Sequence, residues 1–215
     1  MNIKGAIFDM DGTLLDSMTV WDTLAEDYLR TMGIEPRENL SERFKTMSIE
    51  QSADYYISRY GLDKTHDEII NDINCMIEDF YISEAPLKDG VKEFLDYLRE
   101  KGTVMCVATT IDKNIASKAL ERCGISGYFV HIVTCGEAEA GKDEPAIYEK
   151  ALEYLGTEKK YTFVFEDALH AAVTAKNAGF PVAGVYDASE DAQNELQVCS
   201  NVYIKDFRAG KKYFL

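Results

Sequence analysis

Two aspartates near the beginning of the chain have the residue type and spacing of a catalytic or metal-binding pair. Asp9 and Asp11 follow the apolar residues 6–8, which predict the end of a buried strand. Successive side chains of a strand point to opposite faces of the sheet. If this alternation continues just beyond the end of the strand, both carboxylates lie on the same side. Like charges that close are unfavourable unless they share a cation or a proton. The pair therefore predicts a divalent metal, an acid-base couple, or both.

Two structural alternatives compete with this interpretation. Asp and Gly are common turn residues, so residues 9–12 could form a solvated turn. A calcium-binding EF-hand loop needs its glycine at the sixth position, whereas Gly12 is the fourth residue counted from Asp9. The spacing excludes the EF-hand and leaves the turn as the alternative to an active site.

Three further polar segments follow predicted strands. They are Thr109-Thr110 after residues 104–108, Lys142 beyond 131–134, and Glu166-Asp167 after 161–165. Each has an ordinary explanation, because threonines form turns, a lysine can be a solvated charge, and Glu-Asp can cap a helix. In an open α/β sheet, however, ligands bind outside the carboxyl ends of the strands, where all these segments fall. Their joint occurrence in this order favours one shared site.

The elements that must position these segments alternate between helix and strand. Apolar strands are predicted at residues 104–108, 131–134, 161–165, 182–186 and 202–204. Helical patterns separate them at residues 91–101, 112–123, 145–155, 168–178 and 189–198. Strands alternating with helices of ten to twelve residues imply an α/β fold with a doubly wound parallel sheet. The sequence carries neither a Gly-x-Gly-x-x-Gly fingerprint nor a P-loop, which removes the commonest nucleotide-binding explanations for such a sheet.

A different pattern fills the segment between the first strand and the others. Apolar residues at spacings of three and four follow Trp21, and Ser48 and Thr65 each begin a capping box that opens another helix. Pro86 ends this helical segment. We therefore expect residues 1–16 and 86–215 to form the α/β core and residues 17–85 an inserted helical domain.

Composition limits the partners and the compartment. A net charge of −15 disfavours nucleic acid and anionic membranes, which bind mainly clustered Lys and Arg. No window approaches the ~20 apolar residues of a membrane span, and the apolar residues at the start of the chain are too few for a signal peptide. The five cysteines form no Cys-x-x-Cys pair. We expect a cytoplasmic monomer with reduced thiols. The same negative field would repel a phosphorylated substrate, so a phosphate site needs its own positive charge.

At these residues the chain resembles the haloacid dehalogenase superfamily of phosphotransferases. The resemblance begins with Asp-x-Asp-Gly-Thr at residues 9–13 and covers nearly the whole chain. It is closest to the subgroup with a small helical cap after the first strand, which includes β-phosphoglucomutases and many small-molecule phosphatases. It implies a Rossmann-like α/β core with an inserted α-helical cap domain.

By that resemblance, Asp9 would be the nucleophile that attacks phosphorus and Asp11 the general acid and base. The other implied residues bind phosphate (Thr109, Thr110 and Lys142) or Mg²⁺ (Glu166 and Asp167, with Asp9 and the backbone carbonyl of Asp11). The chemistry agrees independently, because an aspartate with a pKa of about 3.9 is ionised at neutral pH and needs no base. Mg²⁺ prefers carboxylate and water oxygens.

The resemblance also implies that the cap sets the choice of substrate. Lys45 and Thr46 align with the cap loop that faces the active site in related enzymes. Trp21 stands where the β-phosphoglucomutases carry a histidine that is important to the mutase reaction. Trp21 is either core packing of the first cap helix or a substrate-facing residue.

The leading hypothesis is a Mg²⁺-dependent phosphatase for a small phosphorylated metabolite, acting through an aspartyl-phosphate intermediate. The alternative is a phosphomutase of the β-phosphoglucomutase type. Trp21, and Ala168 in place of the family's serine, count against the mutase. Dehalogenation is disfavoured because it needs neither Mg²⁺ nor a second aspartate. The intact acids disfavour a catalytically idle binding protein.

Overall fold

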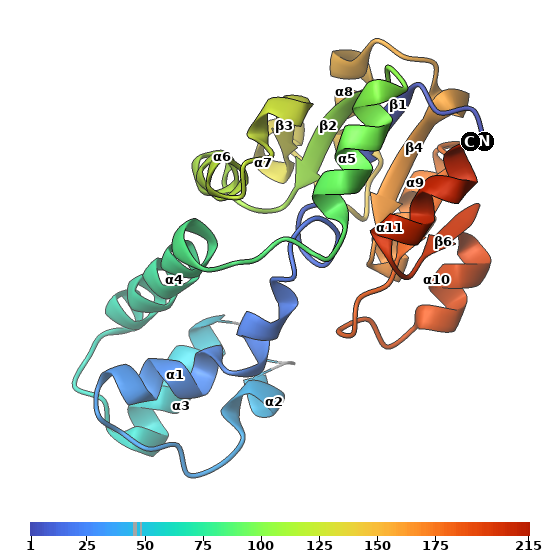
Figure 1. Cartoon of the computed structure of the whole chain (residues 1–215). Helices are drawn as coiled ribbons and strands as arrows, with labels where there is room; N and C mark the ends of the chain where they lie inside the picture. The colour runs from blue at the N-terminus through green and yellow to red at the C-terminus, as the bar shows by residue number, and fades with distance from the viewer. Residues whose placement is uncertain (45–46, 48) are drawn as a thin grey trace. The chain divides into compact units, whose positions relative to one another are not determined.

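The sheet has six parallel strands in the order β3-β2-β1-β4-β5-β6 (Figure 1). The structure is a computed structural model and describes residues 1–44, 47 and 49–215. The strands are β1 (Gly5–Phe8), β2 (Val104–Thr109), β3 (Phe129–Thr134), β4 (Thr162–Glu166), β5 (Val182–Val185) and β6 (Val202–Ile204). This order confirms the predicted doubly wound parallel sheet. The chain builds outward from β1 to β3 and then returns to the other side with β4, so the topological switch point lies between β1 and β4.

Both faces of the sheet are buried, as two neighbouring residues of β1 illustrate. Ile7 belongs to a core cluster that includes residues of α8 (Ala146–Leu155) and α9 (Leu169–Asn177). Phe8 points to the opposite face, where it stacks on Phe165 with ring centroids 4.3 Å apart and meets Phe94 edge-on at 6.5 Å. Phe94 lies on α5 (Val91–Glu100), which packs against α11 (Phe207–Gly210). Burial on both faces explains why the strands are continuously apolar.

The remaining helices of the α/β part of the chain lie between its strands, and a last 3-10 turn follows α11. They are α6 (Lys113–Arg122), α7 (Cys135–Ala138) and α10 (Gln193–Cys199), with 3-10 turns η2 (Ser126–Tyr128), η3 (Lys159–Tyr161) and η4 (Lys211–Phe214). The predicted helix at 189–198 begins later than expected, at Gln193. The side chain of Asp187 and the carboxylate of Glu190 instead hold the residues before it in a loop.

Two compact units make up the chain. The core unit comprises Met1–Ser17 and Ala85–Leu215, and the helical unit comprises Met18–Glu84. The two segments that lead to and from the helical unit are bonded to each other within the core unit. The backbone N–H of Asp16 donates to the carbonyl of Pro86 at 2.9 Å, and that of Lys88 donates to the carbonyl of Leu14 at 3.0 Å.

The two ends of the chain also meet within the core unit (Figure 1). The amino group of Met1 donates a hydrogen bond of 2.6 Å to the backbone carbonyl of Tyr213. Nearby, the hydroxyl of Tyr97 on α5 donates to the carbonyl of Phe214 at 3.0 Å. The last residues are therefore attached both to the first residue and to α5.

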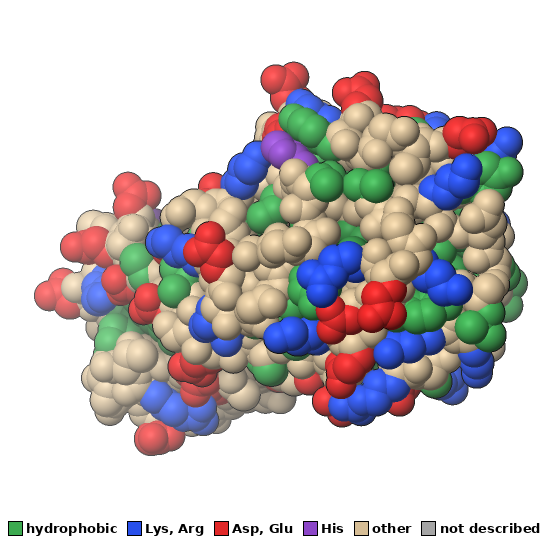
Figure 2. Space-filling view, turned by 45° about the horizontal axis from the view of Figure 1, so that its top comes forward, with side chains coloured by type: hydrophobic (Ala, Val, Ile, Leu, Met, Phe, Trp, Pro, Cys, Tyr) green, Lys and Arg blue, Asp and Glu red, His purple; other side chains and the backbone are tan. Residues whose placement is uncertain are grey.

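Acidic and basic side chains are interspersed on the face seen in Figure 2. The net charge of −15 is therefore an excess of acids over a mixed surface rather than a single acidic block on that face. Across the part of the chain that the structure describes, no helix combines the length and apolar character that crossing a membrane requires.

The helical unit contains α1 (Leu24–Thr31), α2 (Leu40–Phe44), α3 (Ile49–Tyr60), α4 (His66–Ser83) and the 3-10 turn η1 (Met18–Asp22). The predicted capping box at Thr65 opens α4, because the Thr65 hydroxyl accepts from the N–H of Glu68 and the Glu68 carboxylate accepts from the N–H of Thr65. The capping box predicted at Ser48 lies outside the described residues. Tyr28 and Tyr56 pack edge-on, with ring centroids 5.1 Å apart, in the core of this unit.

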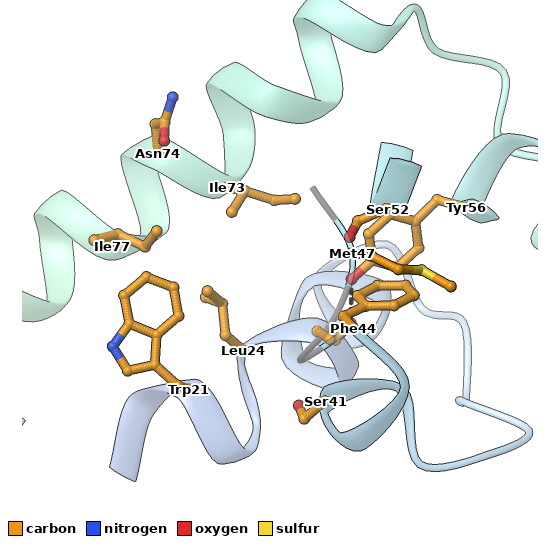
Figure 3. A pocket seen from close by; sticks show the side chains of 11 residues that line it. Trp21, Leu24, Ser41, Phe44, Met47, Ser52, Tyr56, Ile73, Asn74 and Ile77 are labelled. Carbon is orange, nitrogen blue, oxygen red and sulfur yellow. Dashed lines mark hydrogen bonds between the residues drawn. The ribbon is translucent and has the colours of Figure 1, made fainter. Parts of the chain in front are cut away.

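A cavity of about 420 Å³ opens in the helical unit (Figure 3). The described residues that line it are Trp21, Leu24, Ala25, Ser41, Phe44, Met47, Ser52, Tyr56, Ile73, Asn74 and Ile77. Trp21 belongs to η1 rather than to the first α-helix, and 44% of its surface is exposed. The tryptophan therefore borders the cavity instead of filling the core.

Candidate active site

The pairing of the strands brings the sequence-predicted acids to one edge of the sheet. Phe8 pairs with Phe165, and the N–H of Asp9 donates to the carbonyl of Phe165 at 3.0 Å. Asp9 and Glu166 therefore leave β1 and β4 at the same level. Phe8 also pairs with Val107, which places Thr109 near this level at the end of β2. The residues meet at the switch point, where open α/β sheets bind ligands.

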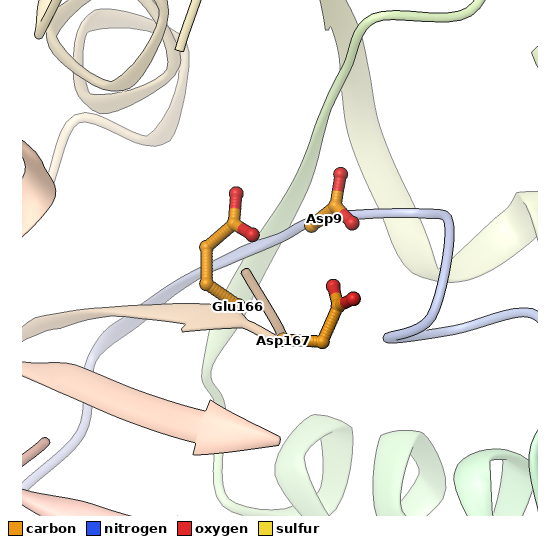
Figure 4. A group of neighbouring side chains, drawn as sticks. All are labelled: Asp9, Glu166 and Asp167. Carbon is orange, nitrogen blue, oxygen red and sulfur yellow. The ribbon is translucent and has the colours of Figure 1, made fainter. Parts of the chain in front are cut away.

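Three buried carboxylates gather there. Asp9, Glu166 and Asp167 each contribute an oxygen to a group in which all the oxygens lie within 4.8 Å of one another (Figure 4). Asp11 is not a member of this group, and its Oδ1 accepts a hydrogen bond of 2.6 Å from the hydroxyl of Ser17. The group consists only of hard oxygen donors, which suits Mg²⁺ better than zinc.

Lys142 supplies a buried positive charge to this cluster. Its Nζ donates to Oδ1 of Asp9 and lies 2.6 Å from Oε1 of Glu166. Burial on its own would lower the pKa of Lys142, but the two carboxylates outweigh burial and raise it. Lys142 therefore stays protonated and forms ion pairs with both Asp9 and Glu166.

The cluster contains three carboxyl groups and one ammonium group. Burial raises the pKa of Asp9 to about 6, although Lys142 opposes the shift. Burial, together with the charges of Asp9 and Glu166, also raises the pKa of Asp167 well above its usual range. The charged forms of Asp9 and Asp167 are both unfavourable, and the lysine contacts Asp9 and Glu166, so the site has the electrostatics of one that accepts a further cation.

The loop after β1 packs directly against Asp167. The hydroxyl of Thr13 donates to Oδ1 of Asp167 at 3.0 Å. Gly12 has a φ of +69°, and a Cβ at this position would lie 2.2 Å from Oδ2 of Asp167. Glycine is therefore required both by the left-handed backbone and by the space that the carboxylate occupies.

The remaining sequence-predicted residues have different surroundings. Thr109 is buried and its hydroxyl accepts from the N–H of Ile111 at 3.1 Å, whereas Thr110 is exposed. Lys45 and Thr46 lie outside the described residues. Trp21 belongs to the helical unit, where it lines the cavity.

Tyr148 is a residue of the site that the sequence did not indicate. This fully buried side chain on α8 donates from its hydroxyl to Oε1 of Glu166 at 3.0 Å. Burial and the Glu166 carboxylate both raise the pKa of Tyr148, so the hydroxyl remains a donor. The only signal in the sequence was a tyrosine on the apolar face of the predicted helix, since a buried tyrosine hydroxyl needs a partner.

Lys88 is a second such residue. Its Nζ donates to the carbonyl of Gly12 at 2.5 Å, to the carbonyl of Tyr186 at 2.6 Å, and to Oδ2 of Asp187 at 2.6 Å. The lysine therefore connects the loop after β1 to the end of β5. No local pattern predicts this contact, because Lys88 and Gly12 are 76 residues apart.

Sequence comparison relates these residues to known proteins. The model of a family described as haloacid dehalogenase-like hydrolases matches residues 6–185. A phosphorylated carbohydrates phosphatase from Thermotoga maritima is 26% identical over 94% of this chain and 94% of its own. The pyrophosphatase PpaX from Bacillus velezensis is 27% identical over 89% of this chain and 87% of its own. Hexitol phosphatase B from Escherichia coli K12 is 23% identical over 90% and 87%.

Solved structures share the fold. A Thermotoga maritima protein provisionally named a β-phosphoglucomutase superposes with a TM-score of 0.87 at 22% identity, over 99% of this chain and 100% of its own. CbbY from Rhodobacter sphaeroides, solved with phosphate, gives a TM-score of 0.71 at 19% identity over 95% of both chains. At these identities the similarity concerns the fold alone.

Proposed function

We propose, for a chain that belongs to the haloacid dehalogenase-like hydrolases, that Asp9 is the nucleophile of a phosphatase for small phosphate monoesters. The observation that carries the proposal is the buried contact of Asp9 with Lys142 beside Glu166 and Asp167 at the switch point. The names of the sequence relatives support it, since they are phosphatases and a pyrophosphatase. Nothing among the described residues favours the phosphomutase alternative, which we do not propose.

The same cluster would hold Mg²⁺. Its ligands would be the carboxylates of Asp9, Glu166 and Asp167 and, from the resemblance, the backbone carbonyl of Asp11. The all-oxygen donor set, and three buried carboxyl groups beside a single lysine, fit such an ion. When bound, it would offset the charge that otherwise keeps an aspartate nucleophile and a phosphate dianion apart.

The reaction would proceed in two steps on the residues of this chain. The carboxylate of Asp9 attacks phosphorus, and the bond to the ester oxygen breaks as Asp11 gives that oxygen a proton. Asp11 then takes a proton from the water that attacks the aspartyl phosphate, which releases phosphate and restores Asp9. Lys142 and the Thr109 hydroxyl would stabilise the phosphoryl oxygens during both transfers. One acid thus serves both half-reactions.

The test is the replacement Asp9→Asn, which removes the nucleophile while nearly preserving its shape. We expect turnover of para-nitrophenyl phosphate with Mg²⁺ to fall by about 10³-fold or more. Asp16→Asn is the matched control, because Asp16 is exposed and follows the same loop. Thermal melts should show both variants folded. An Asp9→Asn protein with normal turnover would refute the covalent mechanism.

A further inference from the structure

Lys88 is a largely buried lysine of the core unit that is separate from the cluster around Lys142. Its side chain is only 15% exposed, and its ammonium donates to the carbonyls of Gly12 and Tyr186 and to Oδ2 of Asp187. A lysine ammonium has three N–H donors, so these three acceptors use all of them. Lys88 therefore has no donor left for a phosphate group, and its role lies in the groups that it holds.

One of these groups is the turn that follows β1. The N–H groups of Leu14 and Leu15 both donate to the carbonyl of Met10, at 2.9 and 2.8 Å, which closes a tight turn. Gly12 lies in the middle of this turn, and its carbonyl accepts from the side chain of Lys88. The backbone N–H of Lys88 also donates to the carbonyl of Leu14 at 3.0 Å. Lys88 is thus attached to the turn at two points.

The glycine at the centre of the turn is the reason that a fixed partner matters. Gly12 has a φ of +69°, and a residue without a Cβ changes its backbone conformation more freely than any other. Asp11 directly precedes Gly12, and Thr13, which donates to Asp167, directly follows it. A rotation of the Gly12 peptide would therefore displace the side chains on both sides. The hydrogen bond from Lys88 opposes such a rotation.

The other acceptors of Lys88 are fixed to the sheet. Tyr186, whose carbonyl accepts from the ammonium, directly follows β5. The side chain of Asp187 is 4% exposed, and its Oδ1 accepts from the N–H and the hydroxyl of Ser189 at 2.9 and 2.6 Å. Because these groups belong to the end of β5 and the loop after it, Lys88 fixes the turn after β1 relative to β5.

We propose that Lys88 is a positioning residue, which places Asp11 by holding the carbonyl of Gly12. The turn would then keep the Asp11 carboxyl group at the ester oxygen, to which it gives its proton as the bond from phosphorus to that oxygen breaks. The proposal rests on the proposed function, because Asp11 is a proton donor only in that reaction. A displacement of about 1 Å can cost 10²-fold in rate, so a small movement of the turn is sufficient.

The first experiment compares two esters whose leaving groups need the proton to different degrees. Phenolate is more basic than para-nitrophenolate, so hydrolysis of phenyl phosphate depends more strongly on a proton donor. Lys88→Met keeps the length of the side chain and removes its donors. We expect kcat/KM at saturating Mg²⁺ to fall by about 100-fold for phenyl phosphate and by about tenfold for para-nitrophenyl phosphate. A purely structural loss would lower both values equally.

The control and a second variant keep this experiment decisive. Lys205→Met is the matched control, because Lys205 is an exposed lysine that lines the same hollow of the core unit as Lys88. It should leave the ratio of the two kcat/KM values unchanged. Lys88→Met leaves Asp187 buried without its positive partner, which is destabilising. The double variant Lys88→Met with Asp187→Asn removes both charges, and we expect it to fold, as thermal melts will show, and to change the ratio in the same way.

The second experiment tests whether Lys88 acts through Asp11. Asp11→Asn removes the proton donor, so it should lower kcat/KM for phenyl phosphate by about 10²-fold or more. In the Asp11→Asn background, Lys88→Met should cost about tenfold or less, against about 100-fold in the parent protein, because the group that it positions is gone.

The outcomes separate this proposal from the proposed function. A larger loss for phenyl phosphate that shrinks in the Asp11→Asn background supports both. Equal losses for the two esters, or an equal cost of Lys88→Met in both backgrounds, would overturn the inference and leave the phosphatase standing. A parent protein that hydrolyses neither ester would overturn the proposed function itself.

Discussion

Gly12 shows how closely the site is packed at the scale of single atoms. Alanine here would combine a left-handed backbone with a Cβ 2.2 Å from Oδ2 of Asp167, so the carboxylate must move. Because a displacement of about 1 Å can cost 10²-fold in rate, we expect Gly12→Ala to lower kcat/KM by about 100-fold. Calorimetric titration with Mg²⁺ should also show weaker binding. Steady-state kinetics with para-nitrophenyl phosphate provide the measurement.

The control for this prediction is Gly102→Ala. Gly102 also has a positive φ, +77°, but its Cβ would meet no atom within 4 Å. The variant carries the backbone strain without the collision, at a cost of about 1–2 kcal/mol in the free energy of unfolding. Its kcat/KM should remain near that of the parent protein. Equal losses of activity in the two variants would show that strain alone is responsible.

Some of the side-chain contacts in the candidate site could be predicted from the sequence, and others could not. The approach of Asp9 and Glu166 could be predicted because parallel strands bring their carboxyl ends to the same edge of the sheet. The contacts of Tyr148 and Lys88 could not, because they depend on how a helix and a linker pack far along the chain. The catalytic roles assigned to the acids stay predictions until the variants are measured.

At the scale of elements, Lys88 and Asp187 join the linker before α5 to the end of β5. Burial raises the pKa of Asp187, but hydrogen bonds from Lys88 and Ser189 more than reverse this, so the net pKa is lowered. A carboxyl whose pKa is lower in the folded state stabilises the protein above its unfolded pKa of about 3.9. The contribution is lost as the pH falls through the lower folded value.

Asp187→Asn should therefore reveal a pH-dependent stability. Removing one partner of a buried ion pair costs on the order of 3 kcal/mol, or roughly 6–12 °C in Tm for a chain of this size. We expect this difference from the parent protein at pH 7 and a smaller one below about pH 4. Thermal melts from pH 3 to pH 8 measure it.

Asp89→Asn is the control, because the side chain of Asp89 is 91% exposed although it lies 3.6 Å from Arg208. Surface pairs of this kind contribute about 0–1 kcal/mol, so Tm should change little at any pH. A difference between Asp187→Asn and the parent protein that persists unchanged to pH 3 would contradict the assigned charge state.

Some helices could be predicted from the sequence, and others could not. The helix α4 was predictable because Thr65 and Glu68 form a capping box that depends only on residues three apart. The helices α7 and α11 have four residues each, which is too short for apolar periodicity to identify. Their ends are held by the side chains of Thr134 and Asp206, which sequence reasoning would assign equally well to turns.

At the scale of the whole molecule, the net charge of −15 opposes the approach of a phosphate dianion. Lys142 does little to offset this at long range, because it is buried between Asp9 and Glu166. Salt screens long-range repulsion, with a Debye length of about 10 Å at 0.1 M. We expect kcat/KM for phosphate esters to rise by about two- to fivefold between 10 and 150 mM NaCl, with kcat nearly constant.

The measurement is steady-state kinetics at saturating Mg²⁺, so that weaker metal binding at high salt does not enter. Sucrose in place of NaCl is the control, because it adds solute without screening and should not raise kcat/KM. A fall in kcat/KM on adding NaCl would mean that an attractive local field, rather than the overall charge, governs the encounter.

The hydrogen bond between the first residue and Tyr213 has a consequence for the connectivity of the molecule. A short glycine linker from Leu215 to Met1 could close the chain, and opening it between Ser17 and Ala85 would give a circular permutant of the core unit without the helical insertion. The circular permutant would then carry every residue of the candidate active site within one continuous core unit: the four acids Asp9, Asp11, Glu166 and Asp167, with Lys142, Tyr148 and Lys88. Such a minimal protein would separate what the phosphoryl-transfer residues achieve by themselves from what the inserted helices add.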